Sequence, residues 1–108
     1  MTRYLSEFQY TPQAFAAYLK DPSDRFAALA PLYAANHATL EAMYLAEGST
    51  TAYVIVTSDS PQSLEALTMA ILATGIIVGL KTTTIWTMAE AAEAMKKAGS
   101  VLYKPPVG

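Results

Sequence analysis

Hydrophobic and polar residues alternate in four short runs along this chain, and longer segments with helical spacing separate these runs. Because side chains alternate across a strand, the alternation predicts strands over residues 3–10, 40–46, 51–58 and 76–86. Apolar residues at helical spacing predict a helix that starts at Pro12, is interrupted at residues 21–23 and restarts through Tyr33. Two further helices are expected, over residues 61–75 and 88–98.

The order of these elements predicts one α+β domain over residues 1–108, with a ferredoxin-like βαββαβ arrangement, an extra C-terminal helix and a Pro-rich tail. Strands two and three form a hairpin around the turn at residues 47–49. The expected strand order is four-one-three-two. Helices cover one face of such a sheet, and this chain has no spare element for the other face.

Helix ends are marked by residues with known capping preferences. Thr11 and Ser60 are expected to cap helices that begin with proline, and Gly99 is expected to end the last helix. Asn36 is expected in the left-handed conformation that ends the first helical segment, because Asn tolerates that conformation.

Composition points to self-association. The chain is 53% hydrophobic and 15% charged, whereas a soluble domain has about 25% charged residues. Apolar surface that persists on a small domain marks a partner or a ligand groove. We therefore expect a homodimer or a higher homo-oligomer that buries the open sheet face.

Other classes of partner have little support in the sequence. The net charge is −2 and the basic residues are scattered, which argues against nucleic-acid binding. The chain has no cysteine, which excludes disulfides and thiolate chemistry. The uncharged segment 66–80 is shorter than the ~20 residues that a bilayer requires. The start lacks the apolar core of a signal peptide, so we expect a cytoplasmic protein without a metal or cofactor.

Several short motifs occur in the order and spacing of the small bacterial GYD-domain family, which the chain resembles over nearly its whole length. They are Tyr4-Leu5 to Tyr10-Thr11, Pro22-x-x-Arg25, Ala66-Leu67-x-x-Ala70, Lys81-Thr82-Thr83 and Lys97-Ala98-Gly99-Ser100 to Tyr103-x-Pro105-Pro106. The resemblance implies a ferredoxin-like fold of the dimeric α/β barrel type, with no settled general activity.

The chain departs from this family at the motif that names it. That motif is a glycine, any residue, tyrosine and aspartate, and here it reads Gly48-Ser49-Thr50-Thr51. Asn36-His37 stands where the family has paired glycines. A role for the Tyr-Asp pair therefore does not transfer to this chain.

The open sheet face carries the candidate catalytic chemistry. Strict alternation assigns to it Glu7, Gln9, Glu41, Met43, Leu45, Tyr53, Ile55, Lys81, Thr83 and Ile85. Glu7 and Lys81 lie on neighbouring strands, and a second copy would enclose them together with Tyr53. Enclosed carboxylates and lysines have shifted pKa values, which suit acid–base catalysis. A satisfied cross-strand ion pair is the structural alternative.

Candidate ligand contacts are drawn from this face and from the end of strand four. They are Gln9, Met43, Ile55, Thr83 and Trp86. Thr83 is also typical of a strand, and Trp86 is also typical of a core or interface anchor. His37, the single histidine, is expected to lie at a surface helix end rather than in a catalytic cavity.

Two functions remain open from the sequence. The first is a binding module that holds a small apolar or aromatic molecule between sheet and helices. The second is a cofactor-free enzyme (an isomerase, lyase or monooxygenase) that uses the Glu7 and Lys81 pair. Because Val101, Leu102 and Tyr103 are apolar, we also expect the tail to dock, on its own sheet edge or across a partner.

Overall fold

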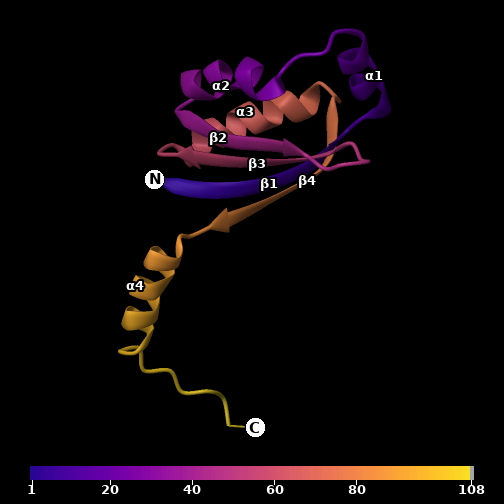
Figure 1. Ribbon diagram of the computed structural model, residues 1–108. Coiled ribbons are helices and arrows are strands. Elements are labelled where there is room, and N and C mark those ends of the chain that lie inside the picture. Colours follow the sequence, from indigo (N-terminus) through magenta and orange to yellow (C-terminus); the bar gives the residue numbers. More distant parts are fainter. Residues whose placement is uncertain (108) are drawn as a thin grey trace.

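The fold is a four-stranded antiparallel sheet with helices α1, α2 and α3 on one side of it (Figure 1). The computed structural model describes residues 1–107. The elements are β1 (Thr2–Tyr10), α1 (Pro12–Lys20), α2 (Arg25–Ala35), β2 (Ala38–Leu45), β3 (Thr51–Ser58), α3 (Pro61–Ala73), β4 (Ile77–Ile85) and α4 (Met88–Ala98). The strand order β2-β3-β1-β4 is the predicted ferredoxin-like order, so the predicted fold class is confirmed.

Local sequence signals explain the helix starts. The Thr11 hydroxyl accepts a hydrogen bond from the Ala14 backbone N–H and precedes Pro12 at the first helical position. Thr87 and Glu90 form a reciprocal capping box at the start of α4. Ser60 occupies the predicted cap position of α3, but its hydroxyl donates to the Ser63 hydroxyl and accepts no hydrogen bond from a backbone N–H of the helix, so it makes no side-chain cap.

The end of α2 differs from the prediction by one residue. Asn36 is the C-cap with φ of −115°, and His37 takes the left-handed conformation with φ of 61°. Asn36 instead donates from its side-chain amide to the Leu32 carbonyl, one turn earlier. A left-handed backbone is unfavourable for most residues with a Cβ, although His is among those that tolerate it best.

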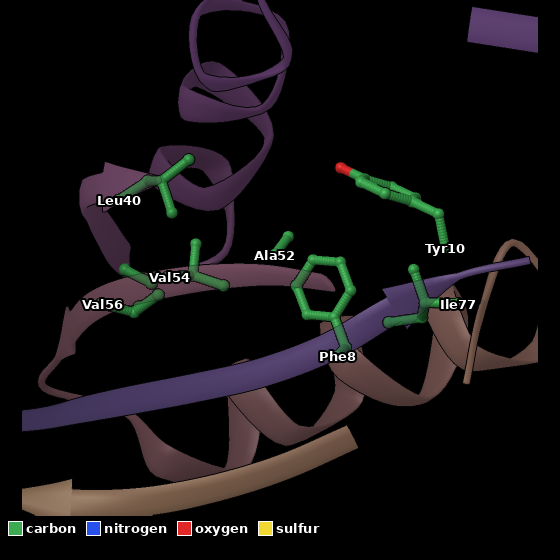
Figure 2. Close-up of a cluster of buried hydrophobic side chains, with 8 residues drawn as sticks. Phe8, Tyr10, Leu40, Ala52, Val54, Val56 and Ile77 are labelled. Atoms are coloured by element: carbon green, nitrogen blue, oxygen red, sulfur yellow. The ribbon is translucent and has the colours of Figure 1, made fainter. Parts of the chain in front are cut away.

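The core lies between the sheet and the helices. Its buried cluster is formed by alternate residues of β1 and β3 together with residues from β2 and β4: Phe8, Tyr10, Ala38, Leu40, Ala52, Val54, Val56 and Ile77. Figure 2 shows seven of these residues labelled, drawn from all four strands. The aromatic set of β1 therefore faces the helices, as the alternation predicts.

A bulge in β2 corrects two predicted positions. Leu40 pairs with Val56, but Ala42 pairs with Ile55, so one extra residue is inserted between them. Met43 then lies opposite Val54, packs against the core and faces the helices. Leu45 lies opposite the buried Ala52 on the same side. The assignment of Met43 and Leu45 to the open face was wrong, and Ala42 and Tyr44 take their place.

Helix α4 and the tail lead away from the rest of the chain, below the sheet in Figure 1, whereas α2 and α3 lie above it. The radius of gyration is 17.9 Å, against about 13 Å for a compact chain of this length. The expectation that the tail docks on its own sheet edge was wrong: Leu102 is 98% exposed and Tyr103 is 75% exposed. The proline pair that follows prevents this segment from continuing as a helix.

Candidate functional site

A cavity of about 530 Å³ lies between the sheet and helices α2 and α3. Helix α2 packs against β2 and α3 against β4, and the cavity lies between the two helices over the central strands β1 and β3. The floor of the cavity comes from β1, β3 and β4, and its walls come from the two helices. Its lining includes Tyr10, Tyr18, Arg25, Tyr33, Leu64 and Val54.

One end of this cavity is aromatic. The Tyr10 ring meets the Phe8 ring edge to face at 5.5 Å between centroids and meets the Tyr18 ring at 5.2 Å. Such edge-to-face pairs fix ring positions as well as burying area. Tyr10 and Tyr18 also line a second cavity of about 360 Å³ under α1, so they form part of the wall between the two. Figure 2 shows the Tyr10 hydroxyl as the one oxygen in the labelled cluster.

Arg25 brings a positive charge into this aromatic end. It is the first residue of α2, and Asp24 caps the helix by accepting hydrogen bonds from the Phe26 and Ala27 backbone N–H groups. Its guanidinium carbon lies 4.7 Å from the centroid of the Tyr18 ring. The Arg25 Nε is buried without a hydrogen-bond partner, and within residues 1–107 the side chain forms no salt bridge.

Two tyrosines of the cavity have a raised pKa and therefore stay protonated to a higher pH than is usual for tyrosine. Burial raises the pKa of Tyr33. Burial also raises the pKa of Tyr10, with the Tyr18 side chain adding to the rise and Arg25 opposing it. Both hydroxyls are therefore neutral near pH 7 and are available as hydrogen-bond donors.

Stability should fall at alkaline pH because of Tyr33. The pKa of Tyr33 in the folded state lies above the unfolded value of about 10. The contribution of Tyr33 to the free energy of unfolding is therefore fully present below pH ~10 and is lost as the pH rises through the folded pKa. We expect the free energy of unfolding to fall less between pH ~9 and ~11 in Tyr33→Phe than in the unsubstituted chain. Urea unfolding measures this. Tyr103→Phe, in the exposed tail, is the control. Identical losses in the chain and in Tyr33→Phe would contradict the assignment.

The open face of the sheet carries a row of polar side chains that runs across all four strands. Lys81 pairs with Glu7, Glu7 pairs with Tyr53, and Tyr53 pairs with Tyr44. Glu7 and Lys81 are thus direct cross-strand neighbours, although no salt bridge joins them within residues 1–107. All four side chains are exposed in a single copy.

A second row lies beside the first, and it is apolar except for Thr83 on β4. Ala42, Ile55, Leu5 and Thr83 occupy matching positions on the four strands. Next to this row, Glu41 accepts a hydrogen bond of 2.9 Å from the Thr57 hydroxyl. The open face is therefore apolar along its middle and polar on both sides of that strip.

Comparison with protein families places these features in one family. The family model for the GYD domain matches residues 4–95, which include nearly the whole sheet, the cavity and most of α4. The chain belongs to the GYD domain family. No match is found among curated proteins.

The GYD domain has a plain hairpin at residues 48–51, where the resemblance to the family leads us to expect its namesake motif. Gly48 has φ of 72°, which favours glycine, and the Ser49 hydroxyl donates to the Thr51 hydroxyl at 3.0 Å. The Thr51 backbone N–H donates to the Ser49 hydroxyl in turn. The turn is therefore held by its own hydroxyl groups.

The predicted contact residues of the GYD domain do not form one site. Gln9, Ile55 and Thr83 lie on the open face with Glu7, Tyr53 and Lys81. Met43 lies on the helix side, against the core. Trp86 follows β4, is 61% exposed and leads into α4, so it is no core anchor.

Arg25 is the residue of this GYD domain that sequence reasoning missed as a site residue. Arg25, Leu29 and Tyr33 follow one another at intervals of four and all line the cavity. A charged residue on the apolar face of a helix is a signal that the sequence carries.

Residues 1–107 hold no group of three or more His, Asp or Glu side chains placed to bind a metal ion. No helix in that range is both long and apolar enough to cross a membrane.

Proposed function

We propose that this GYD domain is a binding module that holds a small apolar or aromatic molecule in the cavity between the sheet and helices α2 and α3. The observation that carries the proposal is the cavity itself. Its volume of about 530 Å³ lies within the range of ligand sites, and apolar side chains dominate its lining. An occupant would bury the apolar lining and gain dispersion contacts with it.

The neutral dye Nile red, whose fluorescence rises in apolar surroundings, tests this function. We expect it to bind the GYD domain at micromolar concentration. Leu64→Trp, in the cavity wall, should reduce the affinity at least tenfold because the larger ring fills the space. Met69→Trp adds the same ring to the same helix at a position that is 60% exposed, and should leave binding unchanged. Equal binding by all three proteins would place the dye elsewhere and contradict the proposal.

The GYD domain is also proposed to form a homodimer through the open sheet face. A single copy leaves Leu5, Tyr44 and Tyr53 exposed there. Burying apolar surface contributes about 25 cal/mol per Å², so this face would be covered in a stable dimer. Charges are few at its centre, where the apolar row of Ala42, Ile55 and Leu5 lies.

The α4 arm, residues 86–107, is proposed to dock on the second copy. Met88, Ala91 and Met95 lie on one side of α4, whereas Glu90, Glu93 and Lys97 lie on the other. Its start is held near the open face, where the Arg3 guanidinium contacts the Glu90 carboxylate at 3.1 Å. Trp86, Met88, Met95 and Leu102 are otherwise in water. A second copy packed on the open face would lie on the side toward which the arm projects (Figure 1).

Acid–base catalysis by Glu7 and Lys81 is the second candidate function. The row of Lys81, Glu7 and Tyr53 across three strands favours it, because it gathers a base, an acid and a hydroxyl donor. In a single copy these groups are in water, so this function depends on the proposed dimer to exclude solvent. It needs no cofactor.

A further inference from the structure

The cavity contains one cation without a counter-ion. Arg25 is the only basic residue among its described lining residues, and the only acidic one is Glu65. Within residues 1–107, no carboxylate comes within salt-bridge distance of Arg25. A positive charge that is partly removed from water is costly unless an anion or hydrogen-bond acceptors accompany it.

Arg25 keeps donors free for a ligand, although its guanidinium also interacts with the Tyr10 hydroxyl. Stacking on Tyr18 engages the flat face of the guanidinium. Its N–H groups point outward in the plane of the group, and the buried Nε has no acceptor. Two parallel N–H donors on one edge of a guanidinium match the two oxygens of a carboxylate.

Glu65 does not neutralise this end of the cavity. It lies in the second turn of α3, a helix that starts just after β3 ends at Ser58. Because Ser58 pairs with Thr2, this part of α3 lies toward the beginning of β1. Arg25 lies instead near Tyr10, at the end of β1, where Arg25 also affects the Tyr10 pKa. The cavity is thus positive and aromatic toward the end of β1, with apolar walls between the two charges.

We propose that the ligand of this cavity is a small carboxylic acid with an apolar or aromatic body, and that Arg25 binds its carboxylate. The inference rests on the proposed binding function and specifies its ligand class. A monoanion is favoured over a phosphate dianion because one guanidinium is the only cation in the lining. The Tyr10 and Tyr33 hydroxyls, which stay protonated, are additional donors on the same cavity wall. The body of the ligand would lie over Val54 and against Leu64.

A matched pair of probes tests this inference. 2-Naphthoate and 2-naphthamide have the same ring system and nearly the same shape, but only the first is charged at pH 7. Isothermal titration should show naphthoate binding about ten- to a hundredfold tighter than the amide, because hydrogen bonds between charged partners are the strong ones. In Arg25→Met the preference should disappear while the amide affinity stays within about threefold. Lys20→Met removes a positive charge outside both cavities and should leave the preference intact.

The outcomes separate this inference from the proposed function. Equal affinities for the two probes in the unsubstituted domain, with Nile red still bound, would overturn the carboxylate inference and leave the binding module standing. Failure of both probes and of Nile red would overturn both. A preference that survives in Arg25→Met would assign the carboxylate to another residue and overturn the role of Arg25. If Arg25→Met does not fold, Arg25→Gln keeps a polar but uncharged end group, and the preference for naphthoate should disappear in that variant as well.

Discussion

Ile55→Asp should convert the GYD domain from a dimer to a monomer. Ile55 lies in the apolar row at the middle of the open face, between Leu5 and Ala42. In the proposed dimer the new carboxylate would be buried without a partner, at a cost of about 3 kcal/mol or more in each copy. Light scattering at micromolar concentration should give twice the chain mass of 11.6 kDa for the unsubstituted domain and 11.6 kDa for the variant.

Ala70→Asp is the matched control for this result. It places the same charge on an exposed position of α3, on the other side of the sheet, and should leave the dimer intact.

Deleting residues 100–108 should weaken the dimer and lower its melting temperature, because the contacts between the apolar tail and the second copy would be lost. A monomer in the unsubstituted domain would contradict the proposed dimer. An unchanged mass and melting curve after the deletion would contradict docking of the tail.

Lys81→Met should destabilise the dimer by about 3 kcal/mol, because it leaves the Glu7 carboxylate enclosed without its cross-strand partner. The double variant Glu7→Leu/Lys81→Met should cost less than the single one, since no charge then remains to be satisfied. Thermal unfolding of the four proteins in this cycle gives the coupling free energy between the two side chains.

An exposed ion pair provides the comparison for this cycle. Lys96 and Glu93 lie 3.0 Å apart on α4, with both side chains more than 60% exposed, and such pairs contribute under about 1 kcal/mol. Coupling between Glu7 and Lys81 that exceeds this value would show enclosure, which the catalytic candidate needs. Strict additivity would mean that the two groups do not interact, and it would remove the basis for acid–base chemistry on this face.

The fold was predictable because the local signals agree with one another. The Pro12 and Pro61 helix starts and the β-branched run of β3 fix the order of elements. Once that order is known, the rules for connections between strands leave only a few possible topologies, and the ferredoxin-like topology is one of them. The strand order and the helix-facing side of β1 were both correct for this reason.

The bulge in β2 was not predictable from alternation alone. The sequence Leu40-Glu41-Ala42 carries no glycine or proline to mark an inserted residue. The bulge becomes visible only across the hairpin, where Glu41 accepts a hydrogen bond from the Thr57 hydroxyl while Ala42 pairs with Ile55. A shift of one residue moves every later side chain to the other face, and Met43 and Leu45 changed sides for that reason.

The candidate site was predictable in part. A cavity between sheet and helices was expected, but the sequence reasoning placed its chemistry on the open face. The cavity exists because α2 and α3 pack on opposite edges of the sheet, and that separation is a tertiary property. Arg25 was available in the sequence, at helical spacing from Leu29 and Tyr33, but a charged first residue of a helix is ordinarily solvent-exposed.

Amide chemical-shift mapping with 2-naphthoate tests the central claim, that the cavity between the sheet and helices α2 and α3 is the ligand site. In ¹H–¹⁵N spectra of the labelled domain, we expect the largest shifts at Arg25, Tyr33, Val54 and Leu64, which line that cavity. Amides of Lys81 and Thr83 on the open face, and of Met95 on α4, should change little. Shifts concentrated on the open face or on α4, with the cavity amides unmoved, would contradict the account.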